Sequence, residues 1–188
     1  MNSLESDSQY AGLKVRAAAM TIDLLIVAGY AVILAIVTTI LFRMTSARHL
    51  MDSAWKRDGV AFLTLILPTI LYFSFQESSS RQATYGKRKM RLKVIDAHGD
   101  RLSTGRALLR SGIKFLPWQM AHTAVFQIWD GNASAFFFAL SLLAQIIVVI
   151  YLLALLFNKQ HRTLYDRLAG SAVVRADVSR PTPPSIRS

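Results

Sequence analysis

Two charged residues at the start of the first long apolar segment are the side chains best placed for chemistry. Arg16 and Asp23 are seven residues apart, so on a helix they would share one face, roughly 10 Å apart along the axis. Asp23 lies within the apolar run Ala17–Phe42, which is long enough to cross a bilayer. A carboxylate there costs roughly 2.5–3.5 kcal/mol on insertion scales and usually faces protein or water. Asp23 is therefore expected to serve either as a proton or cation site or as half of an ion pair that locks helices together.

Further charges flank the predicted spans on the side where the first span begins. Asp23 would lie in the cytoplasmic third of the membrane, close to this group. A buried polar cluster at the cytoplasmic mouth of a helix bundle is therefore expected, either as a transport site or as a structural one. Its predicted members are Arg16, Asp23, Asp166 and Arg110, with Lys114 and Arg167 near the same leaflet.

Four apolar segments would position these charges. The chain is 53% hydrophobic, too apolar for an ordinary soluble domain. We predict an all-α membrane protein with a bundle of about four transmembrane helices. The third segment is the most polar, because it contains Lys114, Pro117 and His122, and it could instead be a re-entrant or interfacial helix. The predicted spans are 17–42, 59–75, 111–129 and 133–157, and no carboxylate other than Asp23 falls inside them.

The charge distribution predicts how these spans are oriented. The net charge is +11, and most of it flanks the apolar runs. Segment 76–110 is strongly basic, and the tail from 158 onward also has more basic than acidic residues. Positive residues prefer the cytoplasm, so both segments are predicted there, with four crossings and both termini inside the bacterial inner membrane.

The segments between the spans have structure of their own. Leu92 and Val94 alternate with basic residues, which is the pattern of a short half-buried strand, and 171–174 is a second strand candidate. A helix is expected to begin near Ser103 or Thr104. The predicted organisation is a polar tail over 1–10, a transmembrane domain over 11–176 and a disordered tail over 177–188.

The basic run in the middle of the chain is predicted to contact anionic lipid rather than nucleic acid. Tyr85-Gly86-Lys87 lacks the other residues of a phosphate-binding Walker motif. No catalytic triad, paired acids or metal-ligand spacing stands out, so we expect no enzyme activity, no metal and no cofactor. The predicted lipid-binding residues are Lys87, Arg88, Lys89, Arg91 and Lys93.

Taken in order, three motifs resemble the RDD family of small membrane proteins, which is named for one arginine and two aspartates. Val15–Asp23 is similar to the opening motif and supplies the arginine and the first aspartate. Gln82–Lys87 and Val94–Ser103 resemble the central signature. Thr163–Ser171 resembles the closing motif and supplies the second aspartate, Asp166. The resemblance covers about residues 11–176.

The chain departs from the family pattern at three positions. Arg91 stands where many members have glycine, Tyr165 replaces a usual histidine, and Ser171 replaces a usual threonine. The change at Tyr165 weakens any role for a titrating imidazole in the closing motif.

The resemblance implies a multi-spanning membrane protein, and suggestions for the family lean toward transport, including cation/proton exchange. The first hypothesis is therefore a transporter for a monovalent cation and a proton, which with four helices would need to form a homo-oligomer. The alternative is a non-catalytic scaffold or accessory subunit that organises a membrane-protein partner or anionic lipid.

Overall fold

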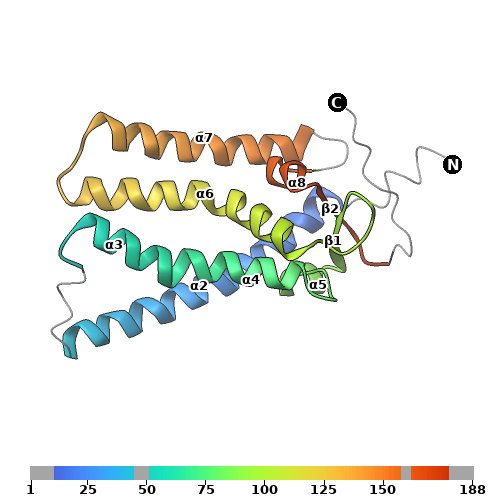
Figure 1. The fold of residues 1–188 in the computed structure, drawn as a ribbon, viewed down its shortest axis with the longest axis horizontal. Coiled ribbons are helices and arrows are strands. Elements are labelled where there is room, and N and C mark those ends of the chain that lie inside the picture. Colours follow the sequence, from blue (N-terminus) through green and yellow to red (C-terminus); the bar gives the residue numbers. More distant parts are fainter. Residues whose placement is uncertain (1–10, 45–50, 158–161, 178–188) are drawn as a thin grey trace.

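The computed structural model describes residues 11–44, 51–157 and 162–177, and it is mostly helical. The predicted tail 1–10 and nearly all of the predicted tail 177–188 lie outside these ranges. Figure 1 shows α7, α6 and the α3–α4 helix lying side by side. Helices α5 and α8 and the two strands gather at one end of these helices, which we call the polar end. The elements are α2 (Leu13–Met44), α3 (Ala54–Ala61), η2 (Phe62–Ile66), α4 (Leu67–Glu77), α5 (Tyr85–Lys89), β1 (Leu92–Asp96), α6 (Thr104–Trp129), α7 (Ala135–Phe157), α8 (Leu164–Leu168) and β2 (Ser171–Arg175).

Three of the described helices are long and apolar enough to cross a membrane, namely Leu13–Met44, Ala54–Glu77 and Ala135–Phe157. They correspond to the first, second and fourth predicted spans. Helix α6 contains the third predicted span and packs along both α7 and α4, but its polar residues keep it outside this group. The fourth crossing therefore stays a prediction.

The second span is longer than the sequence predicted, and this corrects the statement that Asp23 is the only carboxylate in a span. The helix begins after its N-cap Ser53 and continues to Glu77, so it includes Asp58 and Glu77. Both acidic side chains are buried. The predicted boundaries at 59 and 75 were too narrow because they stopped at the first charged or polar residue on either side.

Two prolines inside the helices receive the same compensation. A proline has no N–H, so the carbonyl four residues earlier loses its helical partner. For Pro117 that carbonyl belongs to Ile113, and the Tyr151 hydroxyl of α7 donates to it at 2.8 Å. For Pro68 it belongs to Thr64, and the Tyr30 hydroxyl of α2 donates to it. The π-helical turn η2 ends at Ile66, two residues before Pro68.

The bond from Tyr151 gives the first testable prediction. Tyr151→Phe should lower the free energy of unfolding by about 1 kcal/mol, because a carbonyl within the bundle loses its donor. In a Pro117→Ala background, residue 117 regains an N–H that can bond to Ile113, so the same change should cost clearly less. Thermal unfolding of the four proteins in detergent measures this coupling. Equal costs in both backgrounds would contradict the assignment.

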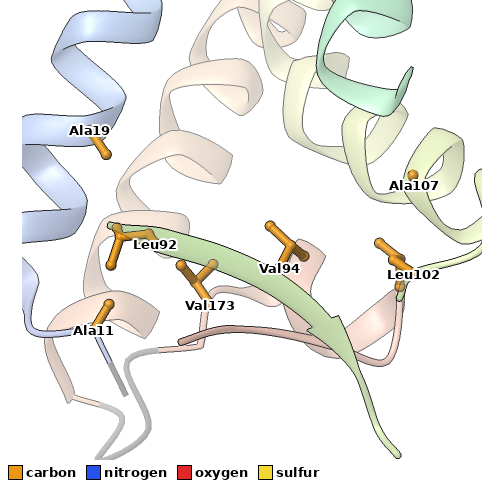
Figure 2. Close-up of a cluster of buried hydrophobic side chains, with 7 residues drawn as sticks. All are labelled: Ala11, Ala19, Leu92, Val94, Leu102, Ala107 and Val173. Carbon is orange, nitrogen blue, oxygen red and sulfur yellow. The ribbon is translucent and has the colours of Figure 1, made fainter. Parts of the chain in front are cut away.

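The two strands pair antiparallel at the polar end, with Val94 opposite Val173 and Ile95 opposite Ala172. The strand predicted around Leu92 and Val94 and the candidate at 171–174 therefore form one small sheet. The side chains of Leu92, Val94 and Val173 point toward the helices (Figure 2). They bury a small apolar core together with Ala11, Ala19, Leu102 and Ala107. This core fixes the sheet against the ends of α2 and α6.

Helix α2 is held almost entirely through its first half. Its buried residues are Arg16, Ala19 and Asp23, which share one face because they are three and four positions apart. Its main packing partner is α5, with fewer contacts to η2. Beyond Asp23 many of its apolar side chains are exposed, as lipid contact would allow.

Candidate functional site

Arg110 is the centre of a buried charge cluster at the polar end of the bundle. It lies on α6, about two turns after the N-cap Ser103, and it is 2% exposed. Its Nε and Nη2 atoms donate to Asp166 Oδ1 at 2.9 and 2.6 Å. Its Nη1 atom donates to Glu77 Oε2. One guanidinium thus joins the end of α4 to α8, and its planar fork suits this double pairing.

Asp166 receives a second arginine from the start of the chain. Arg16 Nη2 lies 2.8 Å from Asp166 Oδ2, so the arginine of the opening motif and the aspartate of the closing motif form an ion pair. The same carboxylate is part of a capping box at the start of α8, where it accepts from the Thr163 N–H at 3.1 Å. Asp166 therefore ties α2, α6 and α8 together from a position with no solvent exposure.

Glu77 is the third fully buried acidic residue of this cluster, and it also has two cationic partners. Lys87 Nζ lies 2.6 Å from Glu77 Oε1, while Arg110 occupies the other oxygen. Lys87 belongs to the short helix α5, which is thereby fixed to the end of α4. Burial of such charges requires pairing, and here every Glu77 oxygen has it.

Asp23 holds the start of α5. Its Oδ2 accepts a hydrogen bond from the Thr84 hydroxyl at 2.5 Å, and its Oδ1 accepts from the Gly86 N–H at 2.8 Å. Thr84 is the N-cap residue of α5, so Asp23 supplies from α2 the capping oxygen that α5 lacks in its own sequence. The carboxylate that the sequence singled out is thus a long-range helix cap.

Gly86 allows this contact because α5 lies directly against α2. A Cβ built on Gly86 would lie 2.2 Å from the Ala19 carbonyl oxygen and 2.9 Å from Asp23 Cγ. No real Cβ tolerates the first distance, so only glycine fits here. The close approach explains why the opening motif and the central segment must fold together.

A cavity of about 150 Å³ adjoins the cluster. Its charged lining residues are Arg16, Asp23, Lys87, Arg110 and Lys114. Residues of α2 and α7 supply apolar walls, including Met20 and Leu152. The cavity lining thus combines four cationic side chains and one carboxylate with apolar residues.

The two arginines control the ionisation of Asp166. Burial alone would raise the pKa of this carboxyl, but the charges of Arg110 and Arg16 outweigh burial and hold its pKa well below the usual range. Tyr165 next to it is affected in the opposite direction, because burial raises the pKa of its hydroxyl. Its ring lies 5.3 Å from the Arg110 guanidinium carbon and supports it as a cation–π partner.

The lowered pKa of Asp166 predicts a loss of stability in acid. The contribution of a carboxylate whose pKa is lower in the folded state is complete above its unfolded value of about 3.9 and disappears as the pH falls below it. We expect the unfolding temperature in detergent to fall progressively as the pH drops from about 4 to about 2, and less steeply in Asp166→Asn. Asp52→Asn is the matched control, because Asp52 is 54% exposed in its pair with Lys56. A pH dependence that is equal in Asp166→Asn and wild type would contradict this assignment.

The structure brings the four predicted cluster residues to one place but arranges them differently from the simplest expectation. Arg16, Arg110 and Asp166 are directly paired, whereas Asp23 is bound to Thr84 and Gly86. Lys114 lines the adjoining cavity. Arg167, predicted near the same leaflet, lies on α8 and is exposed.

The predicted lipid-binding residues divide into two groups. Lys89 and Arg91 are exposed, and Arg88 and Lys93 are partly exposed. Lys87 is different, because it is buried against Glu77, and this corrects its assignment to the surface. The basic run is therefore a surface of four residues, Arg88, Lys89, Arg91 and Lys93, which we call the basic surface.

Two members of the cluster were missed by sequence reasoning. Glu77 lies just beyond the predicted second span and was counted with the polar segment that follows it. Thr84 looked like an ordinary polar residue within the central motif. Both residues are far in the sequence from their partners Arg110 and Asp23, so no helical or strand periodicity links them. The one available signal was that Glu77 is a lone acidic residue at the end of an apolar run.

In the described part of the chain, no three His, Asp or Glu side chains come close enough together to hold a metal ion. The comparisons with known proteins then address the family. No curated protein and no solved structure matches the chain. The sequence model of the RDD family matches residues 10–170, which include the Arg16–Asp166 pair and the Asp23 cap. This match covers most of the chain, and three of its helices are apolar enough to span a membrane, so the protein is a membrane protein that belongs to the RDD family.

Proposed function

We propose that this protein is a non-catalytic membrane platform, in which the buried charge cluster fixes the polar end so that the basic surface can contact a partner or anionic lipid. One observation carries the proposal: each carboxylate of the cluster is already held by donors from other elements. Asp23 binds Thr84 and Gly86, and Glu77 binds Lys87 and Arg110. Asp166 binds Arg16 and Arg110. Such mutual pairing is typical of a structural network.

The membrane arrangement in this proposal has four crossings, with α6 as the fourth. Helix α6 is supported on two sides by α7 and α4, so its polar residues need not face lipid. The polar end, with its basic surface, then lies on the cytoplasmic side of the bacterial inner membrane together with both termini. A reporter fused after Asn132 tests this arrangement: an external reporter supports four crossings, and an internal one contradicts them.

Cation/proton exchange is the second candidate function, and one observation favours it. Asp23 lines the cavity, so its carboxylate is close to a space that water or a cation can enter. The cationic majority in the lining works against it, because four positive side chains repel a transported cation.

Proton movement in vesicles that contain the purified protein separates the two functions. The platform proposal expects no proton movement on addition of Na⁺, K⁺ or Li⁺, and a lower unfolding temperature for Asp23→Asn because one capping oxygen becomes a donor. The control is Asp52→Asn, at an exposed pair far from the cluster in sequence. Cation-dependent proton movement that disappears in a folded Asp23→Asn protein would overturn the platform proposal and establish the transporter.

A further inference from the structure

The cavity beside the cluster has a charge pattern that structural pairing does not explain. Four cationic side chains line it, from three different elements, but only one carboxylate does. That carboxylate, Asp23, already accepts two hydrogen bonds. Together the cluster and the cavity lining contain four basic side chains against three carboxylates, so one basic side chain has no carboxylate of its own.

The basic side chain without a carboxylate partner is Lys114. Its Nζ atom lies 3.6 Å from the centroid of the Phe73 ring and 5.1 Å from that of Phe115. No described carboxylate forms a salt bridge with it, since Glu77 is occupied by Lys87 and Arg110. An ammonium group with aromatic neighbours still has hydrogen-bond donors to place. These donors can serve an anion in the cavity, because Lys114 is one of the lining residues.

The walls of the cavity indicate what carries the anion. Met20 of α2 and Leu152 of α7 are lining residues, and they are 43% and 53% exposed. The main packing partner of α2 is α5 rather than α7, so these two helices leave an apolar side to the cavity. In a membrane such a side faces acyl chains. A ligand with an anionic head and an apolar body matches both parts.

We propose that this cavity binds a phosphate group through Lys114 and Arg16, and that the phosphate belongs to the headgroup of an anionic lipid entering between α2 and α7. A free phosphate ion offers the same chemistry to the same cations, and the two sources differ only in whether the apolar side is used. This site is separate from the basic surface, because none of the four basic-surface residues lines the cavity. It also holds or fails independently of the platform proposal.

The experiment measures lipid retained by the purified protein, with native mass spectrometry, after incubation with phosphatidylglycerol or phosphatidylcholine. We expect one phosphatidylglycerol to be retained in preference to phosphatidylcholine. Lys114→Gln should weaken this retention about tenfold, as expected for the loss of one charged hydrogen bond. Lys114→Arg should restore it. Lys89→Gln is the matched control, because it removes one exposed charge from the basic surface and should change retention less than about twofold.

Two further arms identify the source of the phosphate. Leu152→Trp narrows the apolar side without changing any charge, so it should reduce lipid retention while leaving protection by inorganic phosphate in a thermal-unfolding assay unchanged. Protection by inorganic phosphate that depends on Lys114, with no preference between the two lipids, would overturn the lipid assignment in favour of a free anion. Equal effects of Lys114→Gln and Lys89→Gln, or no effect of either ligand on wild type, would overturn the site itself.

Discussion

Arg110→Met is expected to abolish the folded protein or to lower its free energy of unfolding by about 3–5 kcal/mol. Methionine matches the length of the arginine stem, so packing along α6 is nearly kept. What is lost is the guanidinium between Glu77 and Asp166, both of which have no solvent exposure. Two buried carboxylates would then face each other with one cationic partner each. The measurement is thermal or denaturant unfolding in detergent, with size-exclusion chromatography to report the folded fraction.

A matched control and a combined variant make this prediction specific. Arg106 lies one turn earlier on α6 and pairs with Asp96 at 3.7 Å, but its side chain is 48% exposed. Arg106→Met should therefore change stability by no more than about 0.5 kcal/mol. Combining Arg110→Met with Glu77→Gln and Asp166→Asn should recover none of the loss, because Lys87 and Arg16 would then lose their own carboxylate partners. Similar stability of Arg110→Met and Arg106→Met would contradict the central place of Arg110.

The sequence predicted the elements of this fold well because their signals are local. Ala17–Phe42 and 133–157 closely match α2 and α7, since an unbroken apolar run requires nothing but a length of about 20 residues to indicate a span. Ser103 was a predicted start of the long central helix, and it caps α6. The alternation around Leu92 identified β1. Each of these features depends on neighbours in the sequence.

The pairing within the cluster was not predictable in the same way. Arg16 is seven residues from Asp23, but its partner Asp166 is 150 residues away. The choice of partner depends on how α2, α6 and α8 meet, and no local pattern records that. The sequence could identify which charges are too costly to leave unpaired. It could not say that Asp23 would cap a helix.

The structure also gives a physical meaning to two departures from the family pattern. Arg91 stands at a usual glycine and adopts a φ of 54°, in the left-handed region that glycine occupies without strain. It lies directly after α5 and its C-cap Met90, where such a conformation commonly ends a helix. Tyr165, at the position where the resemblance has a usual histidine, packs edge-on against Tyr151 and places its ring beside the Arg110 guanidinium.

Gly86→Ala is the second change with a large expected effect, because it tests the contact on which the Asp23 cap depends. The added Cβ would lie 2.2 Å from the Ala19 carbonyl oxygen, which is a main-chain atom that no rotamer change can move. Helices α2 and α5 must then separate, and the Gly86 N–H leaves Asp23 Oδ1. We expect a loss of about 3 kcal/mol, at the upper end of the range for overpacked sites. Unfolding in detergent measures it.

The sign of this effect distinguishes a steric contact from an ordinary helix substitution. Gly112 is also helical, on α6, and a Cβ there meets nothing within 4 Å. Gly112→Ala should therefore stabilise the protein by up to about 1 kcal/mol, because alanine is the better helix former. Adding Ala19→Gly to Gly86→Ala should give no rescue, because the obstructing oxygen belongs to the backbone and remains. If Gly86→Ala is as stable as Gly112→Ala, or if Ala19→Gly rescues it, the close approach of α5 to α2 is not what holds Asp23 in place.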